Sequence, residues 1–160
     1  MAQVSHRHAD PPVPDSVAAL EIPEVTPRRG AILVIEDRTD VRQGLTQLLE
    51  LHGFLVLDAP DGERAVEQLT NEPDGIALVM LDLMLPGRIS GHDVRSRQLA
   101  DEHTATIPTI VVSACEPDLR GRAQLRPDAW LEKPFRFDEL LEIVKRFVVP
   151  EPGGVLGIEQ

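Results

Sequence analysis

The sequence is poor in several residue types, and each shortage narrows what the chain can be. The single cysteine, Cys115, cannot form an internal disulfide or hold a zinc ion. Aromatic residues are limited to four Phe and one Trp, with no Tyr, which argues against a base-stacking platform for single-stranded nucleic acid. No apolar run approaches the roughly 18 residues that a membrane-spanning helix needs, and no secretory signal is recognisable. We therefore expect a cytoplasmic protein.

Positive charge is also scarce. The chain has 16 Lys and Arg against 27 Asp and Glu, which gives a net charge of −11 at pH 7. Such an acidic surface repels the phosphate backbone and anionic lipid, so we expect neither nucleic acid nor a membrane as a partner. Lys133 and Lys145 are the only lysines in the sequence, so a lysine at a chemically suggestive position stands out.

The length of 160 residues predicts one domain with extensions. Residues 1–29 hold five of the 14 prolines and lack a sustained hydrophobic period, so we expect a disordered extension. Residues 150–160 begin with Pro-Glu-Pro and contain three glycines, which predicts a flexible tail. The folded domain is therefore expected over residues 30–149.

Within this region, apolar runs alternate with helical patterns. Continuous apolar runs are typical of strands that are buried on both faces, and period-3.6 stripes are typical of the helices that cover them. The strands are expected at residues 31–35, 54–57, 76–81, 107–112 and 129–131, and the helices at residues 40–52, 61–69, 92–102, 118–125 and 138–148. This alternation predicts an α/β fold, a doubly wound five-stranded parallel sheet with helices on both faces.

Polar residues follow four of the five expected strands. Glu36 and Asp37 follow the first strand, Asp82 the third, Ser113 the fourth and Lys133 the fifth. In an open α/β sheet, ligands bind beyond the carboxyl ends of the strands, where the strand order reverses. Any one of these residues alone is explained by a strand that ends toward solvent. The whole ordered set, with one of only two lysines, indicates a site.

The chemistry of this set favours a magnesium ion and a phosphoryl group. Three neighbouring carboxylates repel one another, and a hard divalent cation such as Mg²⁺ relieves that repulsion. A carboxylate beside Mg²⁺ and a lysine can attack a phosphoryl group and form an acyl phosphate. Lys133 and the Ser113 hydroxyl would then stabilise the transferred oxygens.

The segments that carry these residues resemble the receiver domain of two-component response regulators. The similar segments are ILVIEDRTDVRQGL, LVMLDLMLPG, IPTIVVSA and WLEKPF, and together they span about residues 30–149. The resemblance implies a flavodoxin-like (βα)5 fold with Asp82 as the phosphoacceptor. It implies that Asp37 and Asp82 bind Mg²⁺ directly, Glu36 binds it through water, and the Met84 carbonyl completes the protein ligands.

Further roles follow from the same resemblance. Ser113 and Lys133 would bind the phosphoryl group, the Lys133–Pro134 peptide would be cis, and Trp130 would be the switch aromatic. The resemblance implies a stand-alone, chemotaxis-regulator-like response regulator whose partners are a histidine kinase or phosphotransfer protein and an unidentified downstream protein. Its only chemistry would be Mg²⁺-dependent self-phosphorylation and dephosphorylation, so we do not expect an enzyme in the metabolic sense.

Departures from the family pattern leave an alternative open. Glu36 stands where the family commonly has Asp, the turn at residues 87–91 is longer than usual, and the segment between Ser113 and Lys133 is shorter. A receiver-like scaffold that binds partners regardless of phosphorylation would tolerate these changes. A haloacid-dehalogenase-type phosphatase is disfavoured because Met84 occupies the place of its second acid. A nucleotide-binding domain is disfavoured because no glycine-rich loop follows the first strand.

Overall fold

Five parallel strands form one sheet in the order β2-β1-β3-β4-β5. The structure is a computed structural model that describes residues 25–115 and 118–153. The strands are β1 (Ala31–Ile35), β2 (Val56–Ala59), β3 (Ile76–Asp82), β4 (Thr109–Ser113) and β5 (Ala129–Glu132). The helices are α1 (Thr39–Leu51), α2 (Gly62–Asn71), α3 (Gly91–Ala100), α4 (Glu102–Ala105), α5 (Leu119–Leu125) and α6 (Phe137–Phe147), with a short 3₁₀ turn, η1, at Pro73–Gly75.

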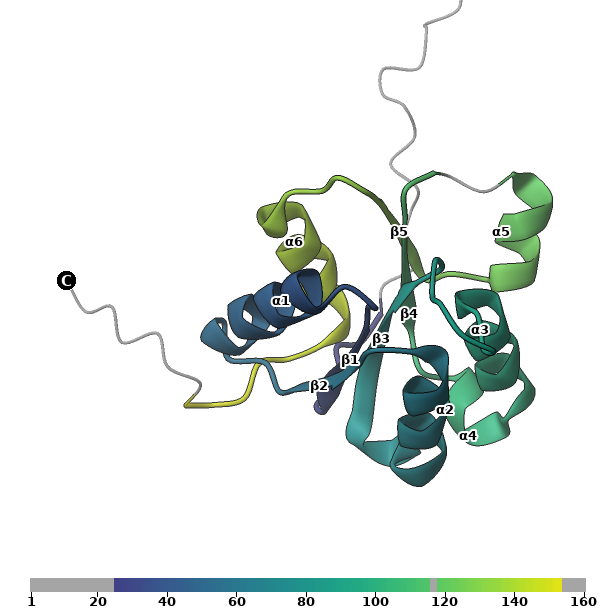
Figure 1. Cartoon of the computed structure of the whole chain (residues 1–160). Coiled ribbons are helices and arrows are strands. Elements are labelled where there is room, and N and C mark those ends of the chain that lie inside the picture. The colour runs from purple at the N-terminus through teal and green to yellow at the C-terminus, as the bar shows by residue number, and fades with distance from the viewer. Residues whose placement is uncertain (1–24, 116–117, 154–160) are drawn as a thin grey trace, which may run out of the picture.

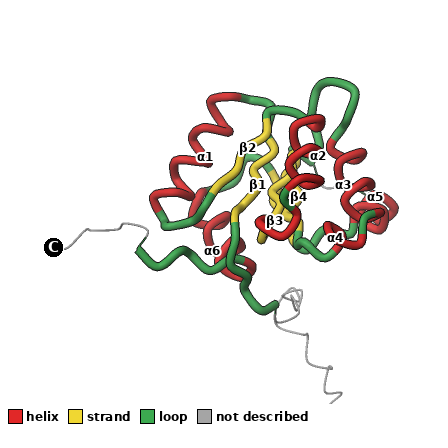
Figure 2. The backbone as a smooth tube through the Cα atoms, turned by 90° about the horizontal axis from the view of Figure 1, so that it is seen from below, coloured by secondary structure: helices red, strands yellow, loops and turns green. Residues whose placement is uncertain are grey.

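The helices cover both faces of the sheet. Helices α1 and α6 lie on one face, and α2, α3, α4 and α5 lie on the other (Figure 1). The view from below shows the same three layers, with the strands between the two groups of helices (Figure 2). The predicted doubly wound parallel sheet is therefore confirmed.

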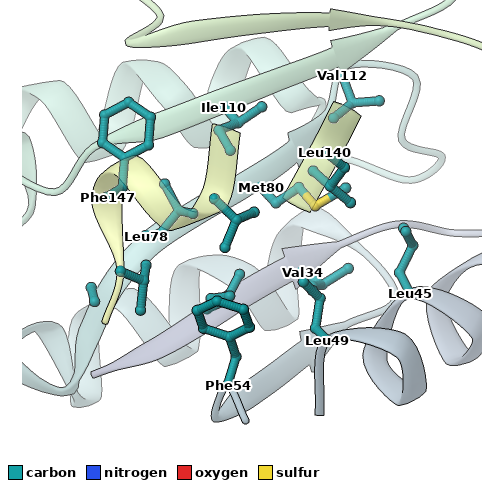
Figure 3. Close-up of a cluster of buried hydrophobic side chains, with 14 of the residues drawn as sticks. Val34, Leu45, Leu49, Phe54, Leu78, Met80, Ile110, Val112, Leu140 and Phe147 are labelled. Carbon is teal, nitrogen blue, oxygen red and sulfur yellow. The ribbon is translucent and has the colours of Figure 1, made fainter. Parts of the chain in front are cut away.

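The apolar runs become strands because both of their faces are buried. In β1, Ile32 and Val34 pack toward α1 and α6, whereas Leu33 and Ile35 pack toward α2 and α3. On the first face, side chains of β3 and β4 meet Leu140 and Phe147 from α6 (Figure 3). Each buried Leu, Val or Ile side chain contributes roughly 1.5–3 kcal/mol to folding, so burial of both faces stabilises these strands between the two helix layers.

Most helices begin where the sequence supplies a capping side chain. Asp61 accepts a hydrogen bond from the Arg64 backbone N–H at the start of α2. Ser90 and Asp93 form a reciprocal capping box at the start of α3, and Asp118 caps α5. These side chains satisfy backbone N–H groups that have no partner within the helix.

Several predicted boundaries differ from the structure by one or two residues, and three of these differences have a clear physical reason. Strand β2 begins at Val56 and not at residue 54, because the Phe54 N–H bonds the Leu49 carbonyl and completes the end of α1. Strand β4 begins at Thr109 and not at residue 107, because the Ile107 N–H bonds Thr104 in the preceding turn. The helix expected over residues 92–102 ends at Ala100. Its successor residue, Asp101, is extended and caps the separate helix α4.

Residues just outside 30–149 also bond to the folded domain. Arg28 forms a parallel bridge with Val148 that includes a 2.7 Å hydrogen bond from its N–H to the Phe147 carbonyl, and the Glu151 N–H donates to Gly53 at 2.9 Å. Residues 1–24 and 154–160, which hold most of the predicted extension and tail, lie outside the described residues. Within residues 25–115 and 118–153, no helix is long and apolar enough to cross a membrane.

Helix α3 buries a polar face that the hydrophobic pattern did not reveal. Arg95 is only 3% exposed. Its guanidinium donates to the carbonyls of Leu125 (2.7 Å) and Arg126 (2.6 Å) at the end of α5, and to the Thr109 hydroxyl at 2.8 Å. Gln98 bonds the same hydroxyl. Arg95 thus satisfies terminal carbonyls of a short helix and fixes α5 against α3 and β4.

Candidate functional site

The predicted acidic residues meet where the strand order reverses. Strand β1 has β2 on one side and β3 on the other, so chain segments diverge at its carboxyl end. Glu36 and Asp37 follow β1, and Asp82 is the last residue of β3. Each of the three offers a carboxylate oxygen, and these oxygens all lie within 4.8 Å of one another. Glu36 and Asp82 are buried, whereas Asp37 is half-buried.

Lys133 supplies the positive charge of the cluster. It follows β5 directly, and its peptide bond to Pro134 is cis, as predicted. The Lys133 Nζ donates to Asp82 Oδ2 at 2.8 Å and to Glu36 Oε2 at 2.9 Å. Charge-assisted hydrogen bonds of this kind are about twice as strong as neutral ones. One ammonium therefore holds carboxylates from two neighbouring strands.

Asp82 is held from a second side by the loop that follows β3. The Met84 N–H donates to Asp82 Oδ1 at 2.9 Å, so both oxygens of the carboxylate are fixed. Gly91, at the start of α3, packs so tightly on this segment that a Cβ there would lie 2.6 Å from the Asp82 carbonyl oxygen. Only glycine fits at that position. The Met84 side chain itself points outward and is 74% exposed.

The lengthened turn at residues 87–91 is anchored to helix α2. The Arg88 N–H donates to Glu63 Oε1 at 3.2 Å. Gly62 lies so close to Ile89 that a Cβ at Gly62 would overlap its carbonyl oxygen, and Gly87 adopts a φ of +96° that favours glycine. The longer turn is therefore held against the fold beside the acidic cluster.

Ser113 lies at the same edge of the sheet. It is the last residue of β4 and is 5% exposed, and the Lys133 N–H donates to its carbonyl at 2.8 Å. Trp130, one strand further along, pairs with Val111 and packs against the α2 and α3 side of the core. Its indole N–H is buried without a hydrogen-bond partner among the described residues.

Burial and hydrogen bonding shift the pKa values of Glu36 and Lys133 in opposite directions. Burial raises the pKa of Glu36 above its ordinary 4.5, and the hydrogen bonds from Lys133 and from the Arg38 backbone offset this only in part. Burial alone would lower the pKa of Lys133. Its hydrogen bonds to Asp82 and Glu36, together with their charges, outweigh burial, so the pKa of Lys133 is raised and the lysine stays charged at neutral pH.

The donor set fits a hard divalent cation. Three carboxylates carry more negative charge than Lys133 can balance, and all three supply oxygen, the donor that Mg²⁺ prefers. The half-buried Asp37 carboxylate has no hydrogen-bond partner in the described part of the chain, so its oxygens are free to bind a cation. The predicted residues Glu36, Asp37, Asp82 and Lys133 are thus brought together.

Sequence reasoning missed Arg42, whose side chain bonds the backbone of the acidic pair. Its guanidinium donates to the Glu36 carbonyl at 2.8 Å and to the Asp58 carboxylate at 2.9 Å. A cation in the first turns of a helix is unfavourable for the helix dipole. Arg42 occupies such a position in α1, and this mismatch was the available signal that it needs a local partner.

This chain combines a parallel sheet, an acidic cluster where the strand order reverses and a lysine that follows the last strand. That combination is typical of phosphoryl-accepting signalling domains. The family model for the response regulator receiver domain matches residues 32–145. The chain belongs to the receiver domain family of two-component response regulators. Receiver domains accept phosphoryl groups and are not enzymes in the metabolic sense.

Individual relatives agree with this assignment. The transcriptional regulatory protein CpxR of Escherichia coli (strain K12) is 32% identical over 114 residues, which cover 71% of this chain and 47% of CpxR. The chain spans about half the length of the curated relatives it matches. Chemotaxis protein CheY4 of Vibrio cholerae has the same fold, with a TM-score of 0.67 at 19% identity over 76% of this chain and 100% of that one.

A third similar structure contains magnesium and beryllium fluoride. The response regulator TrrA of Thermotoga maritima, in complex with Mg²⁺ and beryllium fluoride, is 29% identical with a TM-score of 0.64. The match covers 73% of this chain and 97% of TrrA.

The raised pKa of Glu36 predicts how stability changes with pH in metal-free protein. At low pH Glu36 is protonated in both states. As pH rises past 4.5 the unfolded chain releases this proton first, so the folded state loses stability until pH passes the raised pKa. Glu36→Gln removes this titration. We expect the free energy of unfolding of Glu36→Gln, relative to that of wild type, to increase as pH rises above 4.5. Urea unfolding in EDTA measures this difference.

Glu67→Gln is a matched control, because Glu67 lies on the surface in an exposed pair with Arg64. Its difference from wild type should change little with pH over the same interval. A Glu36→Gln difference that shrinks as pH rises would contradict the raised pKa.

Proposed function

We propose that this receiver domain accepts a phosphoryl group on Asp82 and signals in the cytoplasm through protein–protein contacts. The donor would be a histidine kinase or a phosphotransfer protein. The observation that carries the proposal is the bond of the lone nearby lysine, Lys133, to Asp82 within a cluster of three carboxylates. Asp82 is proposed as the nucleophile because it stands at the phosphoacceptor position that the resemblance to the family implies, with its two oxygens oriented by Lys133 and the Met84 N–H.

In the proposed reaction, an Asp82 carboxylate oxygen attacks the phosphorus atom of the donor's phosphohistidine. A P–O bond forms to Asp82, the P–N bond breaks, and the imidazole leaves with the electron pair. Lys133 remains beside Asp82 and stabilises the negative charge of the transferred oxygens, and the Ser113 hydroxyl donates a hydrogen bond to one of them. Dephosphorylation transfers the same group to water.

Mg²⁺ would be held by the carboxylates of Asp37 and Asp82 and by the Met84 carbonyl, with Glu36 acting through a water molecule. When bound, it supplies the positive charge that neutralises the phosphoryl oxygens. The TrrA complex with Mg²⁺ and beryllium fluoride supports this proposal for a family member.

Trp130 and Ser113 would report and transmit the modification. A buried indole N–H without a partner is unfavourable, so a position in which this group reaches a partner or water would be favoured. A hollow of about 400 Å³, lined by residues that include Arg126, Pro127 and Trp130, opens beside the ring. Ser113 closing on a phosphoryl group would shift the equilibrium between the two indole positions.

Asp82→Asn tests the phosphoacceptor directly, because it keeps the side-chain volume and removes the nucleophile. With acetyl phosphate and Mg²⁺, we expect wild type to gain one phosphoryl group that peptide mass spectrometry maps to Asp82. Asp82→Asn should gain none. Asp74→Asn, an exposed carboxylate in the turn η1, is the control and should label as wild type does. Labelling that persists in Asp82→Asn would show that another residue accepts the phosphoryl group and would contradict the role of Asp82. No labelling of wild type would favour the phosphorylation-independent scaffold.

Trp130 makes a second measurement possible, since it is the only Trp and the chain has no Tyr. Adding Mg²⁺ and then beryllofluoride should change the emission of wild type, because the environment of the indole changes when Ser113 closes on the mimic. Asp82→Asn should show no response to beryllofluoride. An unchanged spectrum in wild-type protein that demonstrably binds the mimic would exclude Trp130 as the switch.

A further inference from the structure

Arg42 connects helix α1, the loop that carries Glu36 and Asp37, and strand β2. It lies in the first turns of α1, and its side chain is only 11% exposed. Nη1 donates to the Glu36 carbonyl at 2.8 Å and makes a longer contact of 3.4 Å with the Asp37 carbonyl. Nε donates to Asp58 on the edge strand β2 at 2.9 Å.

These bonds act on the backbone that carries the two acidic side chains. The Glu36 N–H donates to the Ala59 carbonyl of β2 at 3.1 Å, so the loop is tied to β2 once by its backbone and once through Arg42. Glu36 is additionally fixed by Lys133 and by the Arg38 N–H. Asp37 has no such side-chain support within the described residues, so its direction depends on its backbone.

The charge of Arg42 is balanced away from the cluster. Asp58 is 51% exposed and pairs with Arg42 from β2, whereas the carboxylates of Glu36 and Asp82 pair with Lys133. The guanidinium approaches the acidic pair only at its carbonyl oxygens. Its geometry is suited to orienting the loop, because a planar fork can hold two acceptors at a fixed angle.

We infer that Arg42 is a positioning residue of the metal site: it directs the carboxylates of Asp37 and Glu36 by holding their backbone carbonyls, and Asp58 holds Arg42. Groups that orient metal ligands commonly contribute a tenfold or larger factor to metal affinity. The inference rests on the proposed function, because it takes these carboxylates as the ligands of Mg²⁺.

Charge and positioning predict opposite results for Arg42→Gln. If Arg42 acted on the site only through its charge, its removal would relieve repulsion and tighten Mg²⁺ binding. If it positions the ligands, its removal lets the loop relax and weakens binding. We expect Mg²⁺ affinity, measured by calorimetry on the full chain, to fall by roughly tenfold in Arg42→Gln.

Two further variants complete the test. Arg42→Lys keeps the charge but lacks the fork, so it should also bind Mg²⁺ more weakly than wild type. Arg64→Gln removes one arginine charge from an exposed pair on α2 and should bind as wild type does. In acetyl phosphate reactions, Arg42→Gln should need more Mg²⁺ for half-maximal rate, whereas the rate at saturating Mg²⁺ stays near that of wild type.

The outcomes separate this inference from the proposed function. Mg²⁺ binding by wild type with equal or tighter binding by Arg42→Gln would overturn the role of Arg42 alone. No Mg²⁺ binding by wild type would overturn both. If Arg42→Gln fails to fold, Asp58→Asn tests the inference in its place. This variant should weaken Mg²⁺ binding more than Asp74→Asn does, which removes the same charge from an exposed turn. Equal effects of these two variants would overturn the inference.

Discussion

The ammonium of Lys133, shared between Asp82 and Glu36, is the interaction on which the site depends. Three carboxylates whose oxygens lie within 4.8 Å of one another repel strongly in a partly buried setting. Lys133 balances one of these charges and is 28% exposed, so a phosphoryl group can reach it from solvent. The remaining negative charge is what suits the cluster to a divalent cation. A neutral side chain at residue 133 would leave two buried carboxylates without a counterion.

The sheet makes this arrangement possible because it brings distant residues to one edge. Asp82 ends β3, Glu36 follows the adjacent strand β1, and Lys133 follows β5, beyond β4, with its backbone bonded to Ser113. Both faces of β1 are buried, with Ile32 in one core cluster and Leu33 in the other, so β1 is held between the two helix layers and the acidic pair follows directly at its end. The hydrophobic core and the polar site are therefore specified by the same strands.

The sequence was sufficient for those features that repeat or stand at strand ends. The alternation of apolar runs with helical patterns predicted the sheet, and the polar residues after the apolar runs predicted the acidic cluster. It was insufficient where partners come from distant elements. Arg95 bonds the end of α5 from within α3, so its burial cannot be deduced from the pattern of α3 alone. Arg42 likewise reaches Asp58 on β2. The start of β2 was missed for a local reason, because the Phe54 N–H bonds the Leu49 carbonyl and completes the end of α1.

A double-mutant cycle between Lys133 and Asp82 tests the central claim most directly. The free energy of unfolding would be measured in EDTA for wild type, Lys133→Met, Asp82→Asn and the double variant. The account predicts that Lys133→Met destabilises the wild-type background clearly more than the Asp82→Asn background, with a coupling energy in the range of about 0.5–3 kcal/mol. Equal effects in the two backgrounds would show that the 2.8 Å contact carries no interaction energy and would contradict the account.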